Sequence, residues 1–462
     1  MFACDLPRVR NGSILAAATG LLALSLGCAS SPYDPGWVSG ELGRRAGRAV
    51  PDRTGQARKG ENAFVPSLPK DVRDVASLSE DDAVGVALWN SAPFRADLAQ
   101  LGIARAELDD AAALPNPNLA FLFPVSTRQF ELSATLPISQ LISRKWRVAA
   151  AKLDLERTAR SLLQSGLDAV RDVRIGWAEL EAAKRRRKLR ERAEELIRKS
   201  AELSASRFGN GDISQLEADL VRAEALGAAE LASRSAREEE LVRARLRQLV
   251  GLADSPIGAR IDVAEHAPSL DAPGEEAALE RLAMASRPDV RAAELAIEVA
   301  GERVGLERSR IVQLIARLDA KPIGPAGSSP VVWPPGVVGD VPIFNQNNLG
   351  RGRANADLER ATWFYLATRQ QVVTDVRVAR MELVMALKSR DPWATTIVPL
   401  QEKNVAAAMH ANESGAEAYL VVIEALRRLV DARLRELELG LDISRARARL
   451  DRAVGWRIHA TR

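Results

Sequence analysis

Long stretches of the chain place apolar residues at helical spacings with charged residues between them. One stretch runs without a proline from about Ser139 to Phe208, and another places leucine or valine every three or four residues from Leu426 to Leu441. Apolar positions at this spacing form one stripe on an α-helix. At 1.5 Å per residue the first helix would be roughly 100 Å long. A globule cannot bury the apolar stripes of helices this long. The pattern therefore predicts a helical bundle or a tube.

Two shorter segments alternate apolar and polar residues with a period of two. In the first, the apolar positions are Phe130, Leu132, Ala134 and Leu136, and the positions between them are Glu131, Ser133 and Thr135. Residues 314–321 alternate in nearly the same way. This alternation predicts strands with one apolar and one polar face. A hairpin of two strands is marginal on its own, so these strands need partners.

Each half of the chain reads as helix, strand pair, very long helix, turn and shorter helix. The first of these helices is predicted from Ser79 to Leu114, with Ser79 as its N-cap and Asp82 three residues later. The prolines at positions 115 and 117 end it, because proline cannot continue a helix. The pattern therefore predicts a mainly α protein with a small β part.

An internal repeat relates the two halves. The segment that ends Arg-Leu-Arg-Gln-Leu-Val-Gly at Gly251 is similar to the segment that ends Arg-Leu-Asp-Arg-Ala-Val-Gly at Gly455, and 455 − 251 = 204. Gly211 and Gly415 share this offset, because 415 − 211 = 204. The register thus holds across a whole helix, as expected of a repeat. The N-terminal parts of the two halves match at an offset shorter than 204. This difference indicates an insertion in the second half, near the glycine- and proline-rich residues 324–330.

These features divide the chain into six segments. They are a signal peptide over 1–27, an extended linker over 28–77, the first repeat over 78–251, an inter-repeat segment over 252–286, the second repeat over 287–455 and a tail over 456–462. The linker assignment rests on a composition rich in proline, glycine, serine and arginine with little periodicity.

Composition narrows the function. The chain is 47% hydrophobic but only 4% aromatic, a balance typical of long helices packed side by side. The net charge of +4 does not indicate a nucleic-acid partner, and the basic run over 184–190 lies among acidic residues, as a solvated helix face does. The three histidines are scattered and both cysteines lie in the first 30 residues, so we expect no metal site and no cofactor. The sequence shows no Ser/His/Asp arrangement and no phosphate-binding loop, so we do not expect an enzyme.

The first 28 residues form a targeting segment. Arg8 and Arg10 precede an apolar stretch, Ile14–Leu26, which is too short to span a bilayer and suits the apolar region of a signal peptide. Cys28 follows after one glycine, and the sequence resembles a bacterial lipobox in which this cysteine is lipidated. Ala29 comes next, where an aspartate would favour retention in the inner membrane. We therefore expect an exported lipoprotein of the outer membrane.

From about Leu78 to Gly455 the chain resembles the TolC-like outer-membrane efflux factor family. Residues 207–217, which read Arg-Phe-Gly-Asn-Gly-Asp-Ile-Ser-Gln-Leu-Glu, resemble the first tip turn of that family, and residues 415–428 resemble the second. Residues 287–290, Arg-Pro-Asp-Val, resemble the Arg-Pro-Asp-Leu that opens its second repeat. Residues 341–347, Val-Pro-Ile-Phe-Asn-Gln-Asn, resemble its corner into the second long helix and point toward the heavy-metal-efflux branch.

The resemblance implies a homotrimer in which helical hairpins form a periplasmic α-barrel. Each subunit would contribute four strands to a twelve-stranded barrel in the outer membrane. Phe130, Leu132, Ala134 and Leu136 would then face the lipids, and Glu131, Ser133 and Thr135 the lumen. The protein would be a passive exit duct, opened by a periplasmic adaptor and an inner-membrane pump of the resistance-nodulation-division type.

The resemblance also assigns candidate site residues. The tip that docks the adaptor would comprise Arg207, Phe208, Gly209, Gly211, Ser214 and Gly415. Some family members carry acids six and nine residues after the second tip glycine; these positions are Val421 and Glu424 here. Three copies of Glu424 would form a pore constriction of negative potential that favours cations. The alternatives are that the tip glycines only reverse the chain, that Glu424 is a solvated acid, and that the protein is a periplasmic coiled-coil scaffold without a pore.

Overall fold

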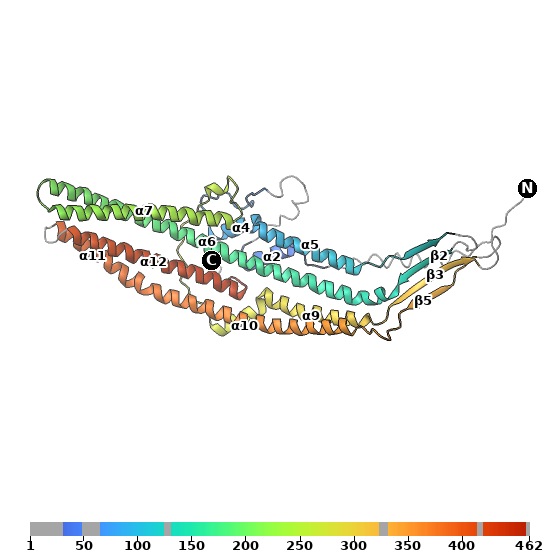
Figure 1. Cartoon of the computed structure of the whole chain (residues 1–462). Coiled ribbons are helices and arrows are strands. Elements are labelled where there is room, and N and C mark those ends of the chain that lie inside the picture. Colours follow the sequence, from blue (N-terminus) through green and yellow to red (C-terminus); the bar gives the residue numbers. More distant parts are fainter. Residues whose placement is uncertain (1–30, 49–64, 124–130, 323–330, 414–418, 459–462) are drawn as a thin grey trace, which may run out of the picture. The chain divides into compact units, whose positions relative to one another are not determined.

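A computed structural model describes residues 31–48, 65–123, 131–322, 331–413 and 419–458 (Figure 1). The predictions for Cys28, for Phe130, for Gly415 and for the insertion near 324–330 concern residues outside these ranges. Contacts divide the chain into two compact units. The first comprises residues 1–34, 99–159 and 291–367, and the second comprises residues 35–98, 160–290 and 368–462.

Helices make up most of the described chain. They are α2 (Pro35–Ala46), α4 (Glu80–Asn90), α5 (Ala92–Ala112), α6 (Ile138–Gly209), α7 (Gln215–Leu249), the 3₁₀ turn η1 (Gly258–Arg260), α8 (Glu276–Ser286), α9 (Pro288–Ser309), α10 (Asn348–Pro392), the π-helical turn η2 (Trp393–Ile397), α11 (Val398–Glu413) and α12 (Tyr419–Val454). None of them combines the length and the apolarity that crossing a bilayer requires, over the residues described. The mainly α fold with a small β part is thus confirmed.

The first unit holds one antiparallel sheet. Its strands are β1 (Asn118–Leu122), β2 (Glu131–Pro137), β3 (Leu314–Pro322), β4 (Val331–Val332) and β5 (Pro335–Gly339). The order is β1-β2-β3, and both β4 and β5 pair with the same side of β3 at different heights. Trp333 and Pro334 separate these two pieces, so they amount to one fourth strand interrupted at a proline. Figure 1 shows β2, β3 and β5 side by side.

The register gives this sheet one apolar face. Residues directly opposite each other on neighbouring strands share a face. The opposed pairs on this face are Leu119 with Ala134, Phe121 with Leu132, Leu132 with Ala320, Ala134 with Leu318, Leu136 with Ala316, and Ala316 with Val337. The other face includes the pairs Ser133 with Asp319 and Thr135 with Arg317. The alternation seen in the sequence is therefore real in both strands where it was predicted.

The second unit is helical and surrounds the middle of α6. The stripe predicted on this helix is buried throughout; its members are Leu163, Leu167, Val170, Trp177 and Leu180. The indole of Trp177 donates a hydrogen bond of 2.9 Å to the carbonyl of Leu78, where the chain pairs with Val263. The bounds of α6, Ile138–Gly209, agree within one residue with the prediction of Ser139 to Phe208.

The prediction of an extended linker is wrong for Pro35–Ala46, which forms helix α2. Val38 and Leu42 are fully buried, and the Leu42 side chain packs directly on Gly166 of α6. The Arg45 guanidinium lies 5.7 Å from the ring centre of Trp456. Tertiary contacts thus stabilise a helix whose own sequence, with three glycines, shows little helical preference.

The single helix predicted from Ser79 to Leu114 is two helices. The N-cap is confirmed, because the Ser79 hydroxyl accepts a hydrogen bond of 3.1 Å from the Asp82 amide. The helix then breaks at Ser91, between α4 and α5. Pro93 explains the break, since it lacks an amide hydrogen and belongs in the first turn of a helix. Ser91 caps the new start by accepting from the Phe94 amide at 3.3 Å.

The matched glycines of the repeat end their helices in the same way. Gly251 and Gly455 adopt φ of 70° and 77°. In each case the residue after the glycine donates to a carbonyl five residues back, Leu252 to Arg247 at 2.9 Å and Trp456 to Asp451 at 3.2 Å. This left-handed helix cap favours glycine, so the equivalence read from the sequence has a structural counterpart.

Candidate functional site

The turn between α6 and α7 is closed by a left-handed glycine. Gly211 adopts a φ of 84° and donates to the Phe208 carbonyl at 2.9 Å. Asp212 donates to the Arg207 carbonyl at 2.9 Å, which completes the helix cap. Gly209 is the last residue of α6 and keeps helical geometry. The positive φ expected at the tip therefore belongs to Gly211 and not to Gly209.

This tip exposes two apolar side chains. Phe208 is 45% exposed and Leu216 is 70% exposed. Between them Ser214 caps α7 by accepting from the Glu217 amide at 3.2 Å, while Arg207 is half-buried. Exposed apolar groups beside a rigid, capped turn form a surface that another protein can bind. The sequence-predicted tip residues Arg207 to Ser214 thus lie together in one turn.

The second hairpin joins α11 to α12. Its core consists of Val405, Val422 and Leu426, and three partly buried residues pack around them: Ala408, Ala425 and Leu429. The first residue of α12, Tyr419, donates its hydroxyl hydrogen to Ser200 of α6. The Ser200 hydroxyl in turn donates to the Leu196 carbonyl at 2.7 Å. A short chain of hydrogen bonds therefore connects the second hairpin to the first, and the sequence offered no signal for it.

Glu424 lies beside two arginines on the same helix face. One carboxylate oxygen is 2.8 Å from Nε of Arg428 and the other is 3.5 Å from Nε of Arg427. All three side chains are exposed by 42% or more. Residues three and four positions apart share a helix face, so the negative charge expected at this position is compensated locally by the two arginines.

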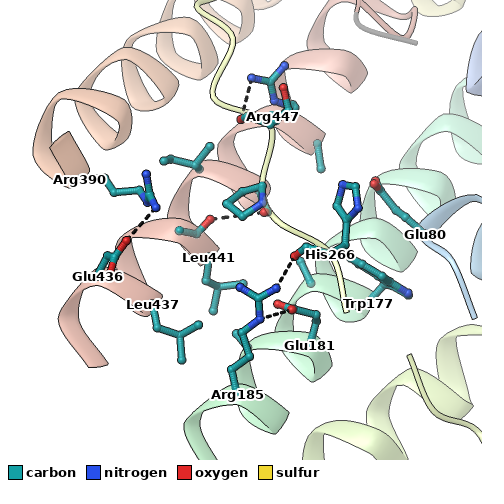
Figure 2. A pocket seen from close by; sticks show the side chains of 18 of the residues that line it. Glu80, Trp177, Glu181, Arg185, His266, Arg390, Glu436, Leu437, Leu441 and Arg447 are labelled. Carbon is teal, nitrogen blue, oxygen red and sulfur yellow. Dashed lines mark hydrogen bonds and ion pairs between the residues drawn. The ribbon is translucent and has the colours of Figure 1, made fainter. Parts of the chain in front are cut away.

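A cavity of about 720 Å³ lies within the second unit, between α6, α12, the start of α11 and the segment around His266 (Figure 2). Two ion pairs from α10 and α11 to α12 border it, Arg390 to Glu436 and Glu402 to Arg433, both at 2.8 Å. On the opposite wall Arg185 donates to the His266 carbonyl at 2.8 Å. The cavity holds no group of three metal-ligating side chains over the described residues.

Two acids of the cavity wall are shifted by burial. Burial raises the pKa of Asp451, against the attraction of Arg174, whose Nη1 lies 3.1 Å away. Burial also raises the pKa of Glu80, whose carboxylate lies 3.2 Å from Nε of the same arginine. Arg174 is itself 4% exposed and also donates to the Ala46 carbonyl at 2.9 Å. This cluster joins α2, α4, α6 and α12 and has the character of a structural core.

The basic run of α6 is engaged within the protein. Lys184 lies 2.7 Å from Asp262, and Arg187 lies 3.0 Å from the buried Glu239. Arg185 and Lys188 form ion pairs with Glu181 and Glu265, respectively. Each of these cations thus has an acidic partner on its own chain, but the helix face is only partly solvated, because Lys184 and Arg187 pack against Asp262 and Glu239.

The apolar strand residues lie where the alternation predicts. Leu132 and Leu136 share the apolar face of the sheet with residues of β1, β3 and β5. This face is open to solvent in the single chain, with Leu119 55% exposed, Phe121 54% and Val337 66%. On the other face Arg317 and Asp319 form an ion pair of 2.7 Å.

The chain was compared with known proteins. No family model matches it. It is 29% identical over 405 residues to the cobalt-zinc-cadmium resistance protein CzcC of Cupriavidus metallidurans, which covers 85% of this chain and 93% of that protein. Among solved structures, CusC superposes with a TM-score of 0.68 at 17% identity over 84% of this chain and 98% of that chain. The outer membrane protein VceC of Vibrio cholerae superposes with a TM-score of 0.68 at 18% identity over 82% of this chain and 96% of that chain.

Proposed function

We propose, from the TolC-like outer-membrane efflux factor fold of this chain, that it is a subunit of an efflux channel in the outer membrane and acts without bond chemistry. The observation that carries the proposal is the sheet. A wholly apolar face on four antiparallel strands, open to solvent in one chain, is the surface that lipids cover in a membrane barrel. The long helices α6 and α10, which follow β2 and β5 along the chain, would form the wall of the proposed channel.

The sheet also favours a closed ring of subunits. Among the described strands, β1 and β5 each pair on one side only, so each leaves an edge of free backbone groups. The strands β1, β2, β3 and β5 alternate in direction, so β5 of one copy can pair antiparallel with β1 of the next. Head-to-tail contacts of this kind close into rings, and closure removes every edge. We propose a homotrimer with four strands from each subunit.

The tips are the proposed docking surface for a periplasmic adaptor. The surface includes the predicted residues Arg207, Phe208, Gly209, Gly211, Ser214 and Gly415. The exposed Phe208 and the glycine-closed turn support this role, since they offer an apolar anchor on rigid backbone. The hydrogen bond from Tyr419 to Ser200 would hold the two hairpins together until an adaptor and its inner-membrane pump separate them.

The cargo follows from the relative whose name states one. CzcC is a cobalt-zinc-cadmium resistance protein, and we propose that this chain likewise exports metal ions, with a pump of the resistance-nodulation-division type. Cys28 would carry the lipid anchor after removal of residues 1–27. The segment over 28–77 would connect this anchor to the repeats over 78–251 and 287–455.

Two adjacent strand residues test the proposal. Leu132 and Ser133 point to opposite faces of β2, because successive strand residues do. Leu132→Arg places a charge on the apolar face, where about 2–4 kcal/mol is lost at the middle of a bilayer. Ser133→Arg, the matched control, places the same charge on the polar face. We expect L132R to abolish membrane assembly and S133R to leave it intact with an altered single-channel conductance.

The measurement is conductance of purified protein in planar bilayers, together with cross-linking of the detergent-solubilised form. Discrete conductance steps and a cross-linked trimer are expected for the wild type and for S133R. A monomeric wild type without conductance, or equal behaviour of the two variants, would overturn the channel in favour of a periplasmic scaffold without a pore.

A further inference from the structure

One arginine on the wall of the cavity has buried donors without an acceptor. Arg447 of α12 donates from Nη2 to the carbonyls of Ser269 and Asp271, at 3.1 and 2.8 Å. Its Nε and Nη1 are also buried, and no atom of the described residues accepts a hydrogen bond from them. A buried N–H group without an acceptor costs free energy, and a buried charge costs more. The guanidinium is therefore satisfied at Nη2 alone.

The positive charge of Arg447 is not compensated at close range. Over the described residues it forms no ion pair, although it feels the attraction of Asp451, Asp271 and Glu80 from further away. Burial outweighs this attraction and lowers the pKa of Arg447. Arginine nevertheless stays protonated in proteins, so an anion placed beside this guanidinium would be stabilised by it.

The other arginines that border the cavity each have a carboxylate partner within the chain. The pairs are Arg390 with Glu436, Arg433 with Glu402, Arg185 with Glu181, Arg174 with Asp451, and Arg457 with Asp81. Asp271 accepts from the Ser269 hydroxyl at 2.7 Å and is exposed to solvent, where water weakens the effect of its charge. Among the residues that the structure describes, the wall thus carries one uncompensated buried charge, at Arg447.

Space for a ligand adjoins this charge. The cavity measures about 720 Å³, and ligand sites in proteins measure about 300–1,000 Å³. Apolar side chains border it, among them Val398 of α11 and Leu437 and Leu441 of α12. Figure 2 shows Arg447, Leu441 and Leu437 in succession along α12. An apolar wall with a single polar anchor is typical of a small-molecule site.

We propose that this cavity binds an organic monocarboxylate with a short apolar chain. The carboxylate accepts hydrogen bonds from the free donors of Arg447, and the chain lies against Leu437 and Leu441. One negative charge matches the one uncompensated cation, and the apolar wall favours a hydrocarbon body over a hydrated inorganic ion. The site is separate from the tips and the sheet, so its occupancy can be measured whether or not the protein conducts.

Hexanoate is the probe for this site. Its binding is measured by isothermal titration calorimetry on the full chain in a non-ionic detergent, with empty micelles as the blank. We expect saturable binding of hexanoate and a rise of the thermal midpoint, because a ligand of the folded state stabilises it. Hexanol and inorganic phosphate should bind at least about tenfold more weakly, since a hydrogen bond to a charged group contributes about that factor.

Three outcomes of this titration would overturn the proposal. Equal binding of hexanol would show that the charge of Arg447 has no part in recognition. Equal binding of phosphate would show that the site takes inorganic anions and not carboxylates with an apolar chain. Absence of saturable hexanoate binding would show that the cavity is not a site for this class of ligand.

A substitution at Arg447 tests the anchor. Arg447→Leu removes the charge and should weaken hexanoate binding about tenfold or more, for the loss of a hydrogen bond to a charged group. Arg449→Leu is the matched control, because it also lies on α12 but loses only an exposed ion pair of 3.0 Å with Glu382. Equal affinity in R447L and R449L would contradict the anchor.

A second variant blocks the cavity without altering Arg447, which also holds the inter-repeat segment. A Cβ added at Gly440 meets only Pro268 Cγ, at 3.6 Å, and both residues border the cavity. Gly440→Leu should therefore fill the site and abolish hexanoate binding. Gly227→Leu is its control, because a Cβ there meets no atom within 4 Å and Gly227 also lies inside a long helix. Hexanoate affinity in G440L equal to that in G227L would overturn the site.

Discussion

The long helices of the two repeats differ in continuity. α6 runs unbroken for 72 residues, whereas its counterpart is divided into α10, η2 and α11. Subtracting the repeat offset of 204 places η2 over residues 189–193 of α6, which read Leu-Arg-Glu-Arg-Ala and are ordinary α-helix. These are strong helix formers, while Pro392 and the β-branched residues after it are not. One proline in a repeated framework thus distinguishes a continuous helix from an interrupted one.

The middle of α6 is held in place by ion pairs and by buried apolar side chains. The middle of α6 contributes Lys184 and Arg187 to cross-helix ion pairs with Asp262 and Glu239, and its apolar stripe is buried. The interrupted helix also pairs with a neighbour, through Arg390 and Glu402 to α12, and both long helices border the same cavity. The two repeats therefore differ in helix continuity although they share one sequence pattern, and the predictions below test the consequences of that difference.

The largest effect is expected at the start of the second repeat. The first repeat opens with Ser91, Ala92 and a proline, while the second has Arg287 in place of that alanine. Arg287 is 2% exposed and lies 2.5 Å from Asp289 and 2.9 Å from Asp375. Arg287→Ala should cost about 3–5 kcal/mol, because it removes a buried guanidinium that pairs with two half-buried carboxylates and donates to the Ala453 carbonyl, and only Arg452 then remains beside Asp375. Thermal midpoints in detergent would measure the loss.

The matched control is Arg291→Ala, four residues later in the first turn of α9, whereas Arg287 immediately precedes that helix. Its ion pairs with Glu294 and Glu298 are exposed, so its loss should cost about 0–1 kcal/mol. Equal shifts in the two variants would contradict the assignment of Arg287 as a buried anchor.

The effect of Arg287→Ala should also depend on pH. Burial disfavours the Asp375 carboxylate, but hydrogen bonds from Arg287 and Gln371 outweigh burial and hold its pKa below the usual value. A lowered pKa adds stability above the unfolded value of about 3.9, and this stability disappears as the pH falls through the folded value. The difference between wild type and R287A should therefore be largest at neutral pH and shrink below about pH 4.

A smaller effect is expected from copying the break into the first repeat. Lys188 occupies the position of Pro392, because 392 − 204 = 188. Lys188→Pro should cost about 3 kcal/mol, since proline inside a regular helix removes a hydrogen bond and clashes with the preceding turn. Lys188→Ala removes only the exposed ion pair with Glu265 and serves as control. A K188P protein as stable as K188A would show that α6 tolerates a joint as its counterpart does.

The smallest effect concerns charge at the second tip. In the proposed pore, Glu424 is compensated by Arg427 and Arg428, so reversal potentials in a KCl gradient should show weak selectivity. Glu424→Gln should favour chloride, and the double change Arg427→Gln with Arg428→Gln should favour potassium. The first shift should be roughly threefold, as one unit charge about 6 Å away in water contributes ~0.7 kcal/mol, and the second, which removes two charges, roughly tenfold. Glu438→Gln, on the same helix, is the control.

The fold was predictable where local pattern and tertiary demand agree. The stripe of Leu163 and Leu167 predicted α6 almost to its ends, and the alternation around Leu132 predicted the faces of the sheet. The predictions for α2 and for the break at Ser91 were wrong. In α2 the contacts of Val38 and Leu42 override a sequence with little helical preference. At Ser91 the helix ends because Pro93, two residues later, cannot continue it, although the apolar pattern runs on.

The candidate site was less predictable. The tip turn could be located from its glycines, but no residue pattern distinguishes Gly211 from Gly209 as the position of the positive φ. Glu424 was identified by position alone, and the arginines beside it change its expected effect. The hydrogen bond of Tyr419 and the cavity depend on distant segments, so no local pattern encodes them. Pro392 indicates an irregular turn at η2, although the apolar residues around it keep a helical spacing.

The uncovered strands have a consequence for biogenesis. In the proposed trimer, the helices of one chain could form by themselves, whereas Leu119 and Val337 would stay exposed to water until strands of other copies pair with this sheet. Closure of the sheet would then depend on the concentration of the chain, and unassembled copies would expose an apolar, aggregation-prone surface.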